Sequence, residues 1–313
     1  MVRPRVVFFG SPHFAVPFLE VIAASADCEL HAVVSQPDRP AGRGKQVTQP
    51  QVVVAANRLG VPALQPERIR TPEFEAALRG LAPDLFVVVA YGRILPQALL
   101  DVPRLGPWNV HASLLPKLRG AAPIQWAIIR GETETGVAVM KMEAGLDTGP
   151  VAAVARTPIT EDDTAGSLSS RLAELGASLL GATLPAIIDG SATLTPQDGA
   201  ASTAAPPLKK EDGHLDFSRP AREVSARARG VDPWPGAFAS LDRAPLKLFG
   251  PHVMGRAGDA PPGAVIGLAP QGLVVACGEG AIAFAELQLP GRKRLPSAAV
   301  LAGHPLPPGT SLT

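Results

Sequence analysis

The sequence predicts an α/β fold in which a doubly wound, mostly parallel sheet is followed by a small β-barrel domain. The chain opens with a β-rich run (Arg5–Phe9), a glycine turn and a helical segment (Phe14–Ser25), which is how doubly wound domains begin. The run Asp84–Ala90 is almost wholly apolar, as in a central parallel strand buried on both faces. After residue 236, short alternating runs separated by glycine turns are typical of a small closed barrel.

Length and composition fit two globular domains. The chain has 313 residues, of which 46% are hydrophobic and 18% are charged. It is therefore too long for one ordinary domain and too apolar to be disordered. Residues 190–206 are small, polar and without apolar periodicity, which is the composition of a linker. We expect a first domain at 1–189, a linker at 190–206 and a second domain at 207–313.

The first domain is expected to alternate strands and helices. Pro50 favours a helix start, because proline is preferred in the first turn, and Thr71 has the side chain of an N-cap. The expected order is strand Glu29–Val34, polar loop Ser35–Pro50, helix Gln51–Leu59, strand Val61–Gln65, a helix from Thr71, strand Asp84–Ala90, a strand through Asn109 and His111, helix Ala122–Arg130, strands Gly136–Met142 and Val151–Ile159, and helix Ser167–Asp189.

The second domain is expected to start with a helix and continue as strands. The helix is predicted at Ala221–Arg229, and a proline-rich turn follows at Asp232–Gly236. The predicted strands are Ala237–Leu241, Leu246–Phe249, Ala264–Leu268, Leu273–Cys277 and Ile282–Leu287.

Charge, cysteines and the missing phosphate motifs exclude several classes. The net charge is +1. Residues 207–313 contain 12 Lys and Arg and 9 Asp and Glu, which is a mild basic excess in the second domain. The spacing of Cys28 and Cys277 is not that of metal ligands. We expect both to be reduced thiols in a cytoplasmic protein, and a disulfide between them is the alternative. We expect no metal.

No apolar run reaches transmembrane length, so no membrane partner is expected. The first turn lacks G-x-G-x-x-G, which excludes a nicotinamide-binding Rossmann enzyme.

The polar loop Ser35–Pro50 carries Arg39, Arg43 and Lys45. It lacks the leading glycine and the Lys-Ser/Thr pair of a phosphate-binding P-loop. A loop of this length in a compact domain is usually functional or disordered, and we favour function over a solvated surface loop.

Two polar side chains share one face of the strand that follows Gly106. Period-2 alternation places Asn109 and His111 together. An amide and an imidazole can both donate hydrogen bonds to an oxygen that gains charge. A second short stretch, Ala144–Pro150, holds Asp147 between glycines, and its carboxylate can reach the same place. Each residue alone has a structural interpretation, as a strand-end histidine or an Asx-turn aspartate.

The combined pattern is more specific. N-x-H-x-S-L-L-P-x-x-R-G-x-x-P, followed about thirty residues later by G-L-D-T-G, resembles the signature of the folate-dependent formyltransferases. Asn109, His111 and Asp147 match that family's three active-site residues. The resemblance runs from about Val6 to Leu289. It implies an N-terminal domain that uses 10-formyltetrahydrofolate and a C-terminal OB-like barrel that assists RNA binding.

Two further features resemble the branch of the family that formylates methionyl initiator tRNA. These are the Gln36–Lys45 loop and the C-terminal module with its Leu208–Phe217 entry and PWPGA turn. Asp232 departs from the Asn that is common before this turn. The resemblance implies that the protein binds tRNA and folate. The N-terminal run is too short for a signal peptide, which favours the cytoplasm, and we expect a monomer. The expected tRNA contacts are Arg39, Arg43, Lys45, Lys209 and Lys210, and the expected folate contacts are Tyr91, Gly92, Ile94, Leu95, Ser113, Leu114, Leu115 and Pro116.

Two alternatives stay open. The chain could be a formyltransferase for a small amine, or an OB-type RNA-binding protein on an inactive α/β scaffold. A tRNA-free activity assay separates the first alternative, and retained folate turnover removes the second. Formyl transfer to charged initiator tRNA, compared with elongator tRNA, resolves most of the choice.

Overall fold

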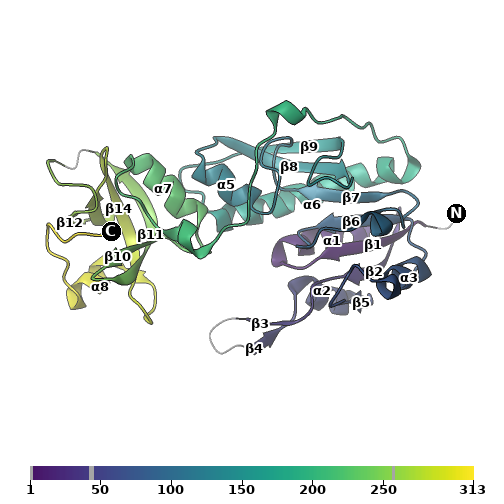
Figure 1. The fold of residues 1–313 in the computed structure, drawn as a ribbon, viewed down its shortest axis with the longest axis horizontal. Helices are drawn as coiled ribbons and strands as arrows, with labels where there is room; N and C mark the ends of the chain where they lie inside the picture. Colours follow the sequence, from purple (N-terminus) through teal and green to yellow (C-terminus); the bar gives the residue numbers. More distant parts are fainter. Residues whose placement is uncertain (1–2, 42–45, 256–257) are drawn as a thin grey trace. The chain divides into compact units, whose positions relative to one another are not determined.

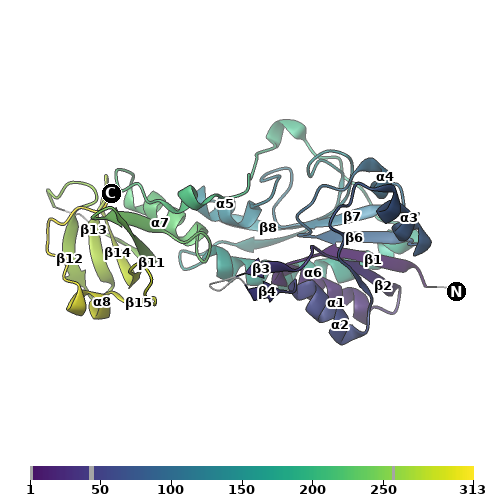
Figure 2. The ribbon, with the colours of Figure 1, turned by 60° about the horizontal axis from the view of Figure 1, so that its bottom comes forward.

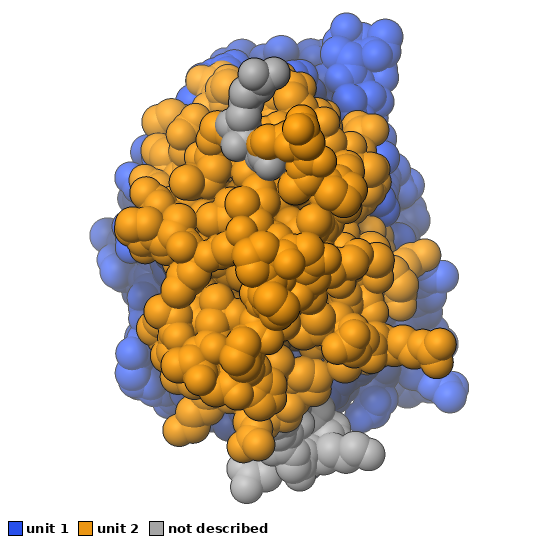
Figure 3. Space-filling model, turned by 90° about the vertical axis from the view of Figure 1, so that its left-hand side faces the viewer, with its two compact units in different colours: residues 1–123, 135–157, 169–206 blue, residues 124–134, 158–168, 207–313 orange. Residues whose placement is uncertain are grey.

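The computed structural model describes residues 3–41, 46–255 and 258–313 (Figure 1). The chain divides into two compact units, which Figure 3 colours separately. Unit 1 comprises residues 1–123, 135–157 and 169–206, and unit 2 comprises residues 124–134, 158–168 and 207–313. Unit 2 is therefore assembled from three separate stretches of chain.

Unit 1 is built on a seven-stranded sheet with the order β5-β2-β1-β6-β7-β8-β9. The pairs β1–β2, β1–β6, β2–β5 and β6–β7 are parallel, and β7–β8 is antiparallel. The sheet is therefore mostly parallel, as the sequence predicts. The strands are β1 (Arg5–Gly10), β2 (Glu29–Val34), β5 (Ala63–Leu64), β6 (Leu85–Val89), β7 (Pro107–His111), β8 (Glu134–Lys141) and β9 (Val151–Pro158).

Helices cover both faces of this sheet (Figure 2). On one face, α3 (Pro72–Gly80) and α4 (Gln97–Leu100) contribute Phe74, Leu78 and Leu99 to a buried cluster with Val7 and Phe86 of the sheet. On the other face lie α1 (Val16–Ala24), α2 (Gln51–Leu59) and α6 (Ala165–Asp189). This is the doubly wound architecture expected from the sequence.

Local sequence accounts for several element ends. The Thr71 side chain accepts a hydrogen bond from the Phe74 N–H at 3.2 Å, so the predicted N-cap is confirmed. Helix α2 spans the predicted residues and ends at Gly60, whose φ of +69° is the left-handed conformation typical of a glycine after a helix.

Helix α6 is long and apolar enough to cross a membrane by length and composition, although no single apolar run in the sequence suggests this. The core helix of a soluble protein passes the same test. Leu172, Leu180 and Leu184 form a buried stripe at helical spacing. Gly176 lies in the same stripe, and a Cβ there would lie 2.7 Å from the Phe18 ring. The apolar face of α6 therefore packs within the protein.

The loop at 35–50 contains regular structure that the sequence analysis did not anticipate. Strands β3 (Arg39–Ala41) and β4 (Gln46–Thr48) pair antiparallel as a two-stranded hairpin. The expected irregular loop is wrong for these residues, because backbone pairing needs no apolar periodicity. Arg43 and Lys45 lie outside the described residues.

The carboxyl ends of β1, β6 and β7 meet at one edge of the sheet. Gly10 pairs with Val89, and Val88 pairs with Asn109. The chain leaves β1 for β2 on one side and later returns to β6 on the other. Ligands of open α/β sheets bind outside the carboxyl ends at such a switch point.

Unit 2 contains an antiparallel sheet with the order β10-β11-β14-β13-β12 and a short β15 paired to β14. These are β10 (Phe238–Leu241), β11 (Ala244–Met254), β12 (Val265–Ala269), β13 (Gly272–Ala276), β14 (Ala281–Gln288) and β15 (Leu295–Pro296). The unit also holds α5 (Pro123–Ile129), the predicted helix α7 (Ala221–Gly230) and α8 (Ser297–Gly303). The curled sheet is OB-like, as expected.

The curled sheet is not closed by its own strands, because β10 and β12 are the two ends of the strand order. The last residues of the chain bridge them instead. The Leu312 N–H donates to Gly263 O at 2.8 Å beside β12, and the Thr313 N–H donates to Ser240 O of β10 at 3.0 Å. The closed barrel predicted from strand pattern is thus a half-barrel completed by a non-strand segment.

Candidate active site

Strand β7 brings Asn109 and His111 to the carboxyl edge of the sheet. Asn109 is half-buried and His111 is buried, with 6% of its surface exposed. Both follow the alternation predicted from the sequence, and both lie beside β8, where Asn109 pairs with Met140 and His111 with Ala138. The strand therefore presents an amide and an imidazole to the same side.

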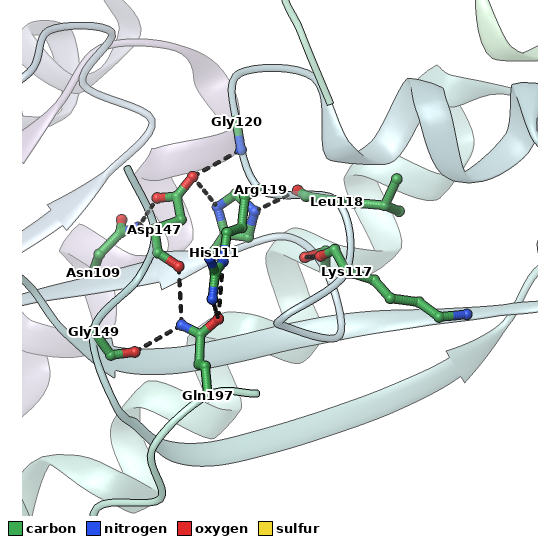
Figure 4. A network of polar contacts seen from close by, with 10 residues as sticks. Asn109, His111, Lys117, Leu118, Arg119, Gly120, Asp147, Gly149 and Gln197 are labelled. Atoms are coloured by element: carbon green, nitrogen blue, oxygen red, sulfur yellow. Dashed lines mark hydrogen bonds and ion pairs between the residues drawn. The ribbon is translucent and has the colours of Figure 1, made fainter. Parts of the chain in front are cut away.

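The two ring nitrogens of His111 face different partners (Figure 4). Nε2 lies 2.9 Å from the main-chain oxygen of Leu118. Because a carbonyl oxygen can only accept, Nε2 carries the proton, and Nδ1 holds the lone pair of the neutral ring. Nδ1 lies 3.7 Å from Oδ2 of Asp147. In the neutral ring Nδ1 is thus the nitrogen able to accept a proton beside a carboxylate.

Asp147 reaches His111 from the loop between β8 and β9. Its backbone φ is +53°, a left-handed conformation that Asp adopts more readily than most residues. Oδ2 accepts a hydrogen bond from the Gly120 N–H at 2.8 Å, and Oδ1 lies 3.5 Å from Nδ2 of Asn109. The structure therefore brings the three predicted catalytic residues together, with 14% of the Asp147 side chain exposed.

Two glycines allow this close arrangement. A Cβ at Gly120, whose φ is +125°, would lie 2.5 Å from Ala205 O, and a Cβ at Gly149 would lie 1.8 Å from Lys141 O. Neither position can carry a side chain without moving the backbone. The backbone of the loops on both sides of His111 therefore requires glycine at these two positions.

The segment at 190–206, expected as a linker, packs in unit 1 against both loops. Gln197 Nε2 donates to Asp147 O at 2.9 Å and to Gly149 O at 2.7 Å. The Leu118 N–H donates to Thr203 Oγ1 at 2.9 Å. Gln197 and Thr203 were not among the predicted site residues, because tertiary hydrogen bonds of a polar segment impose no periodicity on the sequence.

The first group of expected folate contacts, Ser113–Pro116, follows β7. Ser113 is fully buried and donates through Oγ to Lys117 O at 2.7 Å. Leu114, Leu115 and Pro116 are half-buried. Leu115 and Pro116 line a hollow of about 350 Å³ together with residues 151–154 and 195–198.

The second expected group, residues 91–95, follows β6. Tyr91 is buried, its ring packs edge-on against Phe9 at 5.4 Å, and burial raises the pKa of its hydroxyl. Its hydroxyl has no hydrogen-bond partner among the described residues, whereas its main-chain oxygen accepts a hydrogen bond from Gln36 Nε2 at 2.9 Å. Leu95 is buried, and Ile94 is 65% exposed.

Ile94 borders a hollow of about 430 Å³ that the sequence analysis did not anticipate. Its other lining residues are Arg68, Ile69, Arg70 and Arg93. Arg93 is held by Gln36 Oε1 at 3.0 Å and by the main-chain oxygens of Pro66 and Glu67. An apolar floor with three guanidinium groups suits a flat ligand that ends in carboxylates.

The expected tRNA contacts lie in both units. Arg39 is exposed on β3, while Arg43 and Lys45 lie outside the described residues. Lys209 and Lys210 are exposed at the start of a short 3₁₀ helix, Lys210–Gly213, in unit 2. Within the described part of the chain, no three His, Cys, Asp or Glu side chains are grouped to hold a metal ion.

The chain is similar to proteins of one functional class over nearly its full length. Residues 4–184 match the family model described as "Formyl transferase", and residues 207–305 match "Formyl transferase, C-terminal domain". The methionyl-tRNA formyltransferase of Sorangium cellulosum is 50% identical over 310 residues, which is 98% of this chain and 99% of that protein. The enzyme of the same name from Myxococcus xanthus is 48% identical over 99% of this chain and 98% of its own.

Solved structures share the fold at much lower identity. A Helicobacter canadensis N-formyltransferase, in complex with folinic acid and dTDP-3-aminofucose, is 17% identical with a TM-score of 0.68, covering 92% of this chain and all of that one. HypX from Aquifex aeolicus, in complex with tetrahydrofolic acid, is 18% identical with a TM-score of 0.64, covering 96% of this chain and 47% of that one.

Proposed function

Since this chain belongs to the formyl transferase family, we propose that it transfers the formyl group of 10-formyltetrahydrofolate to the α-amino group of methionyl initiator tRNA. The product is N-formylmethionyl-tRNA for translation initiation. The observation that carries this proposal in the structure is His111, held between a carboxylate and a carbonyl beside Asn109. Relatives of the same named activity are 46–50% identical over almost the entire chain.

The residues present fit this chemistry. When bound, 10-formyltetrahydrofolate supplies an electrophilic formyl carbon, which the methionyl amine attacks. The hydrogen bond from Asn109 Nδ2 to Asp147 Oδ1 is long, at 3.5 Å, and it uses one of the two amide protons, so the other proton would be donated to the formyl oxygen as charge develops there. Loss of one such donor costs about 10²–10³ in rate.

His111 is assigned the proton transfer. Its Nε2–H is engaged by Leu118 O, so Nδ1 accepts the proton that the attacking amine must lose. The resulting imidazolium is stabilised by the Asp147 carboxylate 3.7 Å away and returns the proton to the leaving nitrogen. Asp147 itself is oriented by the Gly120 N–H. This proposal gives His111 the proton transfer, whereas the sequence-based expectation had both Asn109 and His111 donating to the oxygen.

We place the folate along the carboxyl edge of the sheet. The backbone of residues 91–95 and 113–116 would contact the pteridine ring, and the hollow beside Ile94 would hold the anionic end through Arg68, Arg70 and Arg93. Arg39, Arg43, Lys45, Lys209 and Lys210 would contact the tRNA backbone. We further propose that the protein is a cytoplasmic monomer without a membrane partner.

Formyl transfer to charged initiator tRNA, measured beside elongator tRNA and a small sugar amine, tests this function. We expect turnover with initiator tRNA and at least about 100-fold less with the small amine, which lacks the distant tRNA body whose binding contributes to kcat. Turnover with elongator tRNA should also be lower. Equal turnover of the free amine would support the small-amine alternative. Folate-independent RNA binding without turnover would support the non-enzymatic one.

A further inference from the structure

Gln197 lies between the two loops that hold His111 (Figure 4). One loop carries Asp147, which faces Nδ1, and the other carries Leu118, whose main-chain oxygen accepts from Nε2. The amide of Gln197 joins these loops through both of its polar atoms. Gln197 is half-buried and belongs to the segment at 190–206, which precedes residues 207–313 of unit 2.

The nitrogen of this amide holds the Asp147 loop. Nε2 donates one hydrogen bond to Asp147 O at 2.9 Å and another to Gly149 O at 2.7 Å. Both of its protons are therefore used on the backbone of the catalytic carboxylate's own turn. That turn needs an external support, because Asp147 has a φ of +53°, a conformation that non-glycine residues disfavour.

The oxygen of the same amide holds the other loop. It accepts from Arg119 Nε at 3.1 Å and from Arg119 Nη2 at 2.8 Å, a two-pronged contact that fixes the guanidinium plane. Arg119 lies between Leu118 and Gly120, which contact His111 and Asp147 respectively. Its own backbone is paired with Thr203 O at 2.8 Å and with the Ala205 N–H at 2.6 Å.

We propose that Gln197 and Arg119 form a positioning pair that sets the separation of Asp147 and Leu118 across the His111 ring. The inference rests on the proposed function, because it assigns the pair to the same catalytic site. Neither residue has to touch substrate. Without the pair, the Asp147 turn and the Leu118–Gly120 loop would still be joined by the Gly120 N–H on Asp147 Oδ2, but their backbones would lose the Gln197 cross-link, and the ring would lose part of its fixed orientation.

Two substitutions separate the arms of the Gln197 amide. Gln197→Ala removes both arms, whereas Gln197→Glu keeps the volume and the acceptor for Arg119 but places a carboxylate against the Asp147 and Gly149 carbonyls. We expect both to lower kcat by about 10- to 100-fold, since a misplacement of about 1 Å can cost 10²-fold. KM for folate and for tRNA should change by less than about threefold, because neither Gln197 nor Arg119 has to contact a substrate in its ground state. Ser202→Ala is the matched control, because the Ser202 hydroxyl lies in the same segment and donates to the nearby Gly199 O at 2.8 Å.

A double-substitution cycle distinguishes positioning from general support. If Gln197 acts through Asp147, adding Gln197→Ala to Asp147→Asn should lower kcat by less than about threefold further, because residues that act as a unit are non-additive. A full additional 10-fold loss, a rise of KM at unchanged kcat, or wild-type kcat in Gln197→Glu would overturn the pair. Wild-type kcat in the Gln197 variants beside an impaired Asp147→Asn would overturn this inference alone. Wild-type kcat in Asp147→Asn would overturn the site assignment and the pair with it.

Discussion

His111 has little freedom at the scale of a single side chain. It is 6% exposed, and its two nitrogens are engaged on opposite sides by a carbonyl and a carboxylate. A histidine in solution would sample both tautomers and rotate. Here the Leu118 carbonyl selects the tautomer with the proton on Nε2, which leaves Nδ1 on the side of Asp147, as the proposed proton transfer requires.

The catalytic trio gives the first prediction. Asn109→Ala, His111→Ala and Asp147→Asn should each lower kcat by about 10²-fold or more, because each removes a contact that strengthens in the transition state. Asn at position 147 keeps the size of the side chain and tolerates its positive φ. Steady-state kinetics with saturating folate and initiator tRNA measure the effect. Combined changes should be less than additive, and near-normal turnover in any single variant would contradict the assignment.

Asp232 gives a pH-dependent prediction. Desolvation raises the pKa of this carboxyl, although Arg294 lies 3.5 Å away. The folded protein thus binds the Asp232 proton more tightly than the unfolded chain does. Stability is therefore lost as pH rises from the unfolded pKa through the folded one.

Asp232→Asn should remove this loss while leaving Arg294 paired with Glu286. We expect the Tm of the variant to equal that of the wild type near pH 3 and to exceed it at pH 7. Thermal unfolding across a pH series measures the difference. An advantage of the variant that is constant with pH would show that ionisation of Asp232 is not the cause.

At the scale of elements, the β3–β4 hairpin gives a third prediction. Arg39 is exposed on β3, and Arg43 follows in the sequence. We expect Arg39→Ala and Arg43→Ala to raise the KM for initiator tRNA by about 3- to 10-fold each. This range corresponds to the loss of one hydrogen bond of about 0.5–1.5 kcal/mol net. The KM for folate should stay within about twofold. Parallel losses for both substrates would indicate damage to the active site.

Sequence pattern was informative for elements that bury an apolar face. Strand β2 and helix α2 have the predicted bounds, since their apolar residues follow the periodicity of each element. Asn109 and His111 were paired by the same alternation. The β3–β4 hairpin, the Gln197 amide and the bridge at Leu312 escaped detection. Each is held by hydrogen bonds between distant polar groups, which impose no repeating pattern on the sequence.

At the scale of the whole molecule, charge is nearly balanced but unevenly distributed. The net charge is +1, with a surplus of three cations in residues 207–313. An overall charge so close to neutral provides little long-range attraction for tRNA. Binding must therefore depend on local contacts between exposed cations and phosphates, and such contacts weaken steeply with salt.

The fourth prediction measures these contacts. Lys209→Ala combined with Lys210→Ala should reduce the log–log salt slope of tRNA binding by about 1.4–1.8, at about 0.7–0.9 for each charge neutralised. Arg219→Ala is the matched control, because Arg219 is already paired with Glu223 at 2.7 Å in the same unit. Titration of tRNA across a salt series compares them. Parallel slopes for the double variant and the wild type would assign the two lysines to the solvated surface.

The interleaved path of unit 2 has a consequence for synthesis on the ribosome. Helix α5 leaves the ribosome early, but α7, whose Gly230 lies against Ile129, begins at Ala221. At about 5–20 residues per second, roughly 5–20 s separate the emergence of the two helices. During that interval the side chain of Ile129 on α5 lacks its contact with α7. A protein proposed to act at the first step of translation thus completes the packing of α5 only after most of its own chain has been synthesised.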